Sequence, residues 1–72
     1  MTRLVAANRV ITADGSEMKP GVVELDGERV VIVSALLGER PFTEWLGGTI
    51  NLLYSADEQL RAYKDGEMLK EK

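Results

Sequence analysis

Carboxylates are the only side chains in this 72-residue sequence that occur in sufficient number to suggest chemistry. Two carboxylates can act as a general acid and a general base, and several together can bind a hard cation. No segment has the alternating oxygen ligands of a Ca²⁺ loop, and no spacing singles out one pair. We therefore interpret the carboxylates as residues of turns and solvated surface: Asp14, Glu17, Glu24, Asp26, Glu28, Glu39 and Glu44.

The sequence contains no histidine and no cysteine. Tight zinc sites use imidazole or thiolate ligands, and oxygen ligands alone bind zinc weakly. A serine nucleophile would also have no histidine base to activate it. We expect no metal ion, no cofactor and no catalytic residue, and hence a protein that is not an enzyme.

The bulk composition is that of one folded domain spanning residues 1–72. Hydrophobic residues make up 44% of the sequence, and the net charge is −3 with scattered basic residues, which disfavours a nucleic-acid partner. The longest apolar run, Val30 to Leu37, is far shorter than the roughly 20 residues of a membrane span. No signal peptide precedes Asn8, so we expect a cytoplasmic protein without a membrane partner.

The first half of the sequence predicts three strands. Branched apolar residues over 3–12 indicate the first strand, and Asp14-Gly15-Ser16 is typical of a bend after it. The second strand, Val22 to Leu25, begins after Pro20, which lacks the amide hydrogen of an interior strand position. The third runs from Arg29 to about Leu37 and is apolar at both parities, which indicates cover on both faces.

Asp26-Gly27 predicts a two-residue type I′ hairpin turn between the second and third strands. The resulting register places Glu24 opposite Arg29, a pair of opposite charges. It also places Val23 opposite Val30, an apolar pair.

Beyond the third strand, residues 38–45 break the periodicity, and we interpret them as an ordered loop. Gly47-Gly48 is then typical of a bend, and Thr49 to Tyr54 predicts a fourth strand. We interpret Tyr54 and Tyr63 as half-buried strand residues.

The tail after Ser55 fits two structures equally well on local signals. Ser55 to Glu58 matches a helix capping box, and Gly66 could end a short helix. Alternatively, residues 59–64 and 67–70 form two strands joined by Asp65-Gly66, with Lys64 opposite Glu67 and Tyr63 opposite Met68.

Several turns and strands together resemble the two ends of amidohydrolase chains. The opening match consists of Asn8, Thr12, Asp14-Gly15, Gly21-Val22-Val23 and Asp26-Gly27. The closing match consists of Asn51 to Tyr54 and of Leu60 to Leu69 with Asp65-Gly66-Glu67. In that superfamily the two ends pair into a composite β-sandwich beside the catalytic barrel. The resemblance implies an all-β fold, a small antiparallel sandwich or barrel of five or six strands, and it favours strands in the tail.

The middle of the sequence departs from the amidohydrolase pattern. Where those enzymes continue to a His-x-His strand, this sequence has Leu36 to Trp45, and it is similar there to short uncharacterised bacterial proteins with a Thr-Glu-Trp-x-Gly segment. The resemblance implies the sandwich without the metal site.

Trp45 has two interpretations, a lid that seals an open end of the sandwich or an exposed anchor for a partner. A chain this short covers only part of its apolar surface. We therefore expect self-association as a homodimer, or association with another protein as an accessory subunit. The expected interface, on the surface where amidohydrolases would meet their barrel, comprises Leu36, Leu37, Phe42, Trp45 and Leu46.

The leading functional hypothesis is thus a non-catalytic module that acts through association. The alternatives are a small-ligand-binding protein with a pocket near Trp45, or an enzyme that uses carboxylates alone.

Overall fold

The computed structural model describes residues 2–35 and 43–70, and the expected fold class is confirmed because these residues are all-β. Three of the expected interface residues, Leu36, Leu37 and Phe42, lie outside the described residues. The described strands are β1 (Arg3–Ala7), β2 (Arg9–Ile11), β3 (Glu17–Met18), β4 (Gly21–Asp26), β5 (Arg29–Ala35), β6 (Thr43–Trp45), β7 (Thr49–Tyr54), β8 (Leu60–Lys64) and β9 (Glu67–Leu69).

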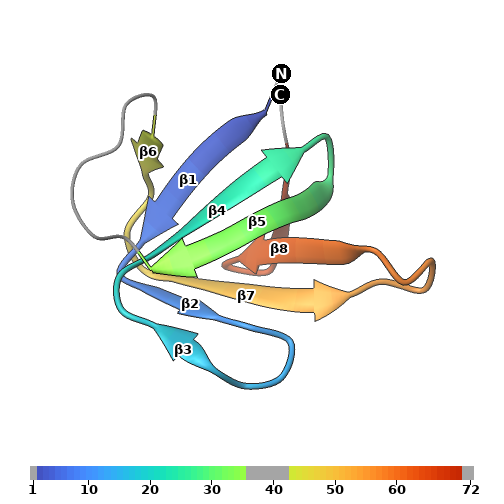
Figure 1. The fold of residues 1–72 in the computed structure, drawn as a ribbon, viewed down its shortest axis with the longest axis horizontal. Coiled ribbons are helices and arrows are strands. Elements are labelled where there is room, and N and C mark those ends of the chain that lie inside the picture. The colour runs from blue at the N-terminus through green and yellow to red at the C-terminus, as the bar shows by residue number, and fades with distance from the viewer. Residues whose placement is uncertain (1, 36–42, 71–72) are drawn as a thin grey trace.

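The strands form two packed sheets (Figure 1). One sheet has four strands in the order β5-β4-β1-β6, and the other has five in the order β3-β2-β7-β8-β9. The expectation of an antiparallel fold of five or six strands needs correction. The pairs β1–β6 and β2–β7 are parallel, so both sheets are mixed, and the described residues form nine strands.

The single first strand expected over residues 3–12 is in fact two strands in different sheets. The chain breaks at Asn8, passing from β1 in the four-stranded sheet to β2 in the five-stranded sheet. β6 and β7 make the same passage through Gly47-Gly48, whose φ angles of 71° and 65° confirm the expected bend. Asn8 Oδ1 accepts a hydrogen bond from the Gly48 amide at 2.9 Å, which fixes the two crossings side by side.

The expected loop over residues 38–45 also needs correction at its end. Thr43–Trp45 forms β6, which pairs in parallel with β1. Parallel pairing with a strand forty residues away leaves no local sequence signal, because it needs no turn next to it. The short strand β3 was likewise not expected; it consists of two residues, and both pair with β2.

The β4–β5 hairpin turns one residue later than expected. Asp26 pairs with Arg29, so Gly27-Glu28 is the two-residue loop, and only Gly27 has a positive φ, of 65°. That pattern fits a type II′ turn rather than type I′. A bulge follows, and the later turn and the bulge together pair Glu24 with Ile32 instead of Arg29.

The extra residue of the bulge in β5 is Val31. Together with the later turn, it shifts the register so that Val23 pairs with Val33 instead of Val30. The third strand was expected to be buried on both faces. This prediction is wrong at Val31 and Ile32, which are 41% and 51% exposed.

The tail is extended, and the strand alternative is confirmed. β8 and β9 pair with Lys64 opposite Glu67 and Tyr63 opposite Met68. Asp65 and Gly66 both have positive φ angles, of 55° and 82°, as a type I′ turn requires. The expected fourth strand, Thr49–Tyr54, is also present as β7.

The hydrophobic core lies between the two sheets. Every buried side chain among the described residues is hydrophobic, and the strands β1, β4 and β5 face β2, β7 and β8 across it. The buried core residues are Val5, Ala7, Val10, Val23, Leu25, Val30, Ile50, Leu52 and Ala62.

Candidate interface and binding surfaces

Trp45 lies on the outer face of the four-stranded sheet. It pairs with Ala6, which pairs with Val22, and residues paired in this way share one face of a sheet. Their chain neighbours Val5 and Val23 belong to the core on the other face. Trp45 therefore does not close an open end of the sandwich, and its exposed fraction of 55% disagrees with the lid interpretation.

The other described residue of the expected interface, Leu46, points elsewhere. Its side chain is partly buried and packs against the core cluster, and its amide donates a hydrogen bond to the Ala6 carbonyl at 2.8 Å. Leu46 thus anchors the crossing between the sheets. The structure does not place it beside Trp45 on the outer face.

Ile32 joins Trp45 on the outer face of the four-stranded sheet. It pairs with Glu24, which has the same parity as Val22 and pairs with Leu4. Ile32 lies on β5 and Trp45 on β6, the two edges of this sheet. Val22 and Ala6, on the two strands between them, are each 1% exposed, so the two side chains do not form one continuous exposed patch. We call this outer surface the outer-sheet face. Each of the two side chains has more than half of its surface exposed.

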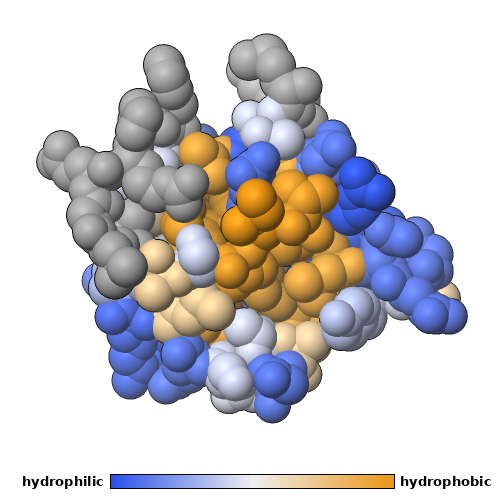
Figure 2. Space-filling model, viewed as in Figure 1, coloured by the Kyte–Doolittle hydropathy of each residue, from blue (hydrophilic) through white to orange (hydrophobic). Residues whose placement is uncertain are grey.

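A second surface is an open depression of about 520 Å³ between β5 and the five-stranded sheet. Figure 2 shows hydrophobic residues gathered in the middle of the molecule, over β5 and the strands beside it in Figure 1. The depression does not lie near Trp45, where a ligand pocket was expected. Its lining residues are Thr12, Ala13, Asp14, Ser16, Met18, Val33, Leu52, Tyr54 and Leu60.

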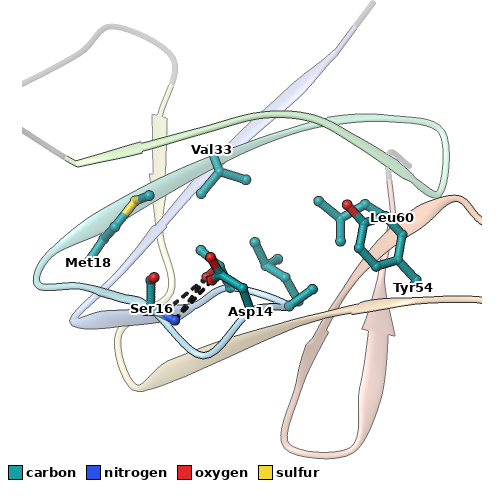
Figure 3. A pocket seen from close by; sticks show the side chains of 9 residues that line it. Asp14, Ser16, Met18, Val33, Tyr54 and Leu60 are labelled. Atoms are coloured by element: carbon teal, nitrogen blue, oxygen red, sulfur yellow. Dashed lines mark hydrogen bonds between the residues drawn. The ribbon is translucent and has the colours of Figure 1, made fainter.

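The wall of the depression includes the loop between β2 and β3, which is held by local hydrogen bonds. Asp14 Oδ1 accepts from the Thr12 hydroxyl and from the Ser16 amide, the latter at 3.1 Å (Figure 3). The Thr12 amide donates to the Ser16 carbonyl at 2.8 Å. Chiefly the hydrogen bond from Thr12, and then those from Ser16, lower the pKa of the Asp14 carboxyl below its usual value of 3.8.

The loop between β7 and β8 repeats this arrangement. Asp57 Oδ1 accepts from the Ser55 hydroxyl and from the Gln59 amide at 3.2 Å. The Ser55 amide donates to the Gln59 carbonyl at 2.9 Å. The pKa of Asp57 is lowered from 3.8, mainly by the hydrogen bond from Ser55. Asp57 differs from Asp14 in two respects: it does not line the depression, and its Oδ2 accepts a hydrogen bond from the Arg61 guanidinium at 2.9 Å.

The sequence reasoning missed the depression. Tyr54, interpreted as half-buried, is 67% exposed at the end of β7, whereas Tyr63 is half-buried as expected. The bend Asp14-Gly15-Ser16 was recognised, but only the pairing of distant strands brings it close to Val33 and Leu60. No local pattern carries that information.

Within residues 2–35 and 43–70, no three Asp or Glu side chains come together as a group that could hold a metal ion. These residues also include no helix long and apolar enough to cross a membrane.

No protein-family model and no curated protein matches this sequence. A solved structure is similar, that of a mutant N-acetyl-D-glucosamine-6-phosphate deacetylase from Mycobacterium smegmatis in complex with N-acetyl-D-glucosamine-6-phosphate. The match has a TM-score of 0.55 and 27% sequence identity, and it covers 71% of this chain and 13% of the deacetylase chain.

This match supports an amidohydrolase-related fold for the β module. The chain spans only about an eighth of the deacetylase, so the likeness concerns a small part of that enzyme. The activity and the ligand of the deacetylase belong to that protein.

Proposed function

We propose that this chain is a non-catalytic β module that acts through association, and that the outer-sheet face is its interface. The observation that carries the proposal is the exposure of Trp45 and Ile32, 55% and 51%, on one face of one sheet. Exposed tryptophan is favoured at interfaces because its large ring loses much water contact when a partner covers it.

The favoured partner is a second copy of the chain. A two-fold axis through the outer-sheet face would bring the Trp45 of each copy against the same face of the other, which is the usual symmetry of homodimers. The face is also suited to another protein, which would make the chain an accessory subunit. Its likeness to part of a much longer deacetylase supports that version, because such a part meets further structure in the longer chain.

Replacing Trp45 by alanine is expected to weaken association. Truncating a centrally buried interface tryptophan costs about 2 kcal/mol or more, which corresponds to about a thirtyfold weaker dimer. Sedimentation equilibrium of the native chain and of Trp45→Ala at several micromolar concentrations measures this change. A native chain that sediments only as an 8.0 kDa monomer would contradict self-association.

Leu53→Ala provides a matched control. Leu53 is also 55% exposed, but it lies on the outer face of the five-stranded sheet, because its neighbour Leu52 is in the core. This variant is expected to associate like the native chain. If the native chain is monomeric, capture experiments with native and Trp45→Ala chains as bait test the accessory-subunit version. A partner retained equally by both baits would contradict the proposed interface.

The carboxylate-only enzyme has no supporting observation. Where the pKa of a carboxyl shifts, in Asp14, Glu44 and Asp57, it shifts downward. A general acid at neutral pH needs the opposite shift.

A further inference from the structure

The floor of the depression between β5 and the five-stranded sheet is apolar and belongs to the core. Leu52 is 1% exposed at its base, and Val33 and Leu60 pack against the core cluster from β5 and from the start of β8. The volume of about 520 Å³ falls within the range of small-molecule sites. An apolar body of the size of one or two rings would cover side chains that are now open to water.

The lining of the depression carries a negative charge only. Asp14 is the single charged residue among the nine that line it. Its hydrogen bonds with Thr12 and Ser16 fix the carboxylate on the wall formed by the β2–β3 loop. An anionic ligand would be repelled there, whereas an ammonium group would be attracted. The phosphorylated sugar bound by the similar deacetylase is therefore a poor match for this depression.

The aromatic ring of Tyr54 completes the arrangement. Figure 3 shows Asp14 between Met18 on one side and the Tyr54 ring on the other, with Val33 across the opening. Tyr54 is 67% exposed, so its ring is accessible to a ligand. The face of an aromatic ring attracts cations and also packs well against apolar groups.

We propose that this depression binds a small organic cation, with its apolar body on Val33, Leu52 and Leu60 and its ammonium group beside Asp14. This site is independent of the proposed association, since Trp45 does not line the depression. The association and the cation site can therefore fail separately.

The test is a titration of the isotope-labelled chain, followed by amide chemical shifts, with two probes of opposite charge. The probes are 2-phenylethylamine and 3-phenylpropanoate. The amine is expected to shift the amides of Ser16, Met18, Tyr54 and Leu60 and to bind about two- to fivefold tighter than the carboxylate, the range of an exposed ion pair. Equal affinity for the two probes, or shifts confined to other residues, would overturn the proposal.

Asp14→Asn and Asp57→Asn form a matched pair for the charge. Both substitutions keep the side-chain shape and remove a carboxylate from loops with the same hydrogen bonds, but only Asp14 lines the depression. Asp57→Asn also removes the ion pair with Arg61, which lies outside the depression. Asp14→Asn is expected to abolish the preference for the amine, and Asp57→Asn to leave it unchanged. The proposal fails if the two variants behave alike. Trp45→Ala is expected to keep the preference, even where it dissociates the dimer.

Discussion

At the scale of single residues, two Asp-Gly pairs adopt different backbone dihedral angles and therefore occupy different positions in their turns. Asp65 adopts a φ of 55°, and the turn has the register of the strand alternative, with Lys64 opposite Glu67. Asp26 keeps an extended conformation, pairs with Arg29 and forms an ion pair with it at 3.1 Å. The same dipeptide predicted both turns from the sequence. The turn at Asp26-Gly27 is accompanied by a bulge at Val31, and the turn at Asp65-Gly66 is not, a difference that leaves no mark in the dipeptide itself.

Gly21 occupies a position where the fold has no room for a side chain. A Cβ added there would lie 2.6 Å from Val10 Cγ2 and 3.1 Å from Met18 Cβ. Gly21→Ala is expected to lower the free energy of unfolding by about 1–3 kcal/mol, the typical cost of overpacking. Urea unfolding of the native and variant chains measures the difference.

The background variant Val10→Ala tests the cause of that cost. Removing Val10 Cγ2 relieves the shortest contact, so Gly21→Ala should cost less in the Val10→Ala chain than in the native chain. Equal costs in the two backgrounds would show that Val10 Cγ2 is not the obstacle, because Val10 Cβ, 2.9 Å from the added Cβ, remains in both.

At the scale of elements, the strands that end in local turns were predictable from the sequence, and those that depend on distant partners were not. β7 and the start of β4 carry turn residues or a proline at their ends. The tail hairpin has such residues too, but its local signals fitted a helix equally well, and the resemblance favoured the strands. By contrast, the run over residues 3–12 is apolar on both faces, because β1 and β2 bury opposite sides in two different sheets. Periodicity cannot show the crossing at Asn8, which is fixed by a hydrogen bond to Gly48, forty residues away.

The two equivalent loops at Asp14 and Asp57 predict a defined response to acid. Each carboxyl has a folded-state pKa below its usual 3.8, so its stabilising contribution is complete above that value. The contribution is lost as the pH falls below 3.8 through the folded-state pKa. The free energy of unfolding should therefore decline over this range.

The double variant Asp14→Asn with Asp57→Asn isolates the two loops. Glu44, whose pKa is also lowered, titrates in both chains, so the difference between the two pH profiles reports Asp14 and Asp57. Urea unfolding at a series of pH values should give a shallower decline for the double variant. Parallel profiles would mean that these loops do not contribute to the acid response.

At the scale of the whole molecule, two sheets share the chain so thoroughly that neither is a separate unit. The segment β1–β2 and the segment β6–β7 each contribute one strand to each sheet, and they pair with each other in both. The sequence predicted that the apolar strands form the core, and the buried residues between the sheets confirm this. Its lateral limits were not predictable, because the open depression beside β5 results from the way the two sheets close on each other.

Arg3 links three distant parts of the molecule. Its guanidinium donates to both carboxylate oxygens of Glu44 at 3.1 and 2.9 Å, and to the Lys70 carbonyl at 2.9 Å. The ion pair joins β1 to β6, and the third bond joins β1 to Lys70, the residue directly after β9. The hydrogen bond from Arg3 is also the main cause of the lowered pKa of Glu44.

A double-mutant cycle with Arg3→Met and Glu44→Gln should measure this link. The side chains are 29% and 53% exposed, so solvent screens the pair and we expect a coupling of about 0.5–1 kcal/mol, at the upper end for exposed pairs because the contact is bidentate. Urea unfolding of the native chain, both single variants and the double variant gives the coupling. Glu44→Gln should cost less than Arg3→Met, because Arg3 keeps its bond to the Lys70 carbonyl when Glu44 is replaced, whereas Arg3→Met removes both contacts. Additive effects of the two substitutions would show that the pair does not stabilise the fold, and that β6 is held to β1 by its backbone pairing alone.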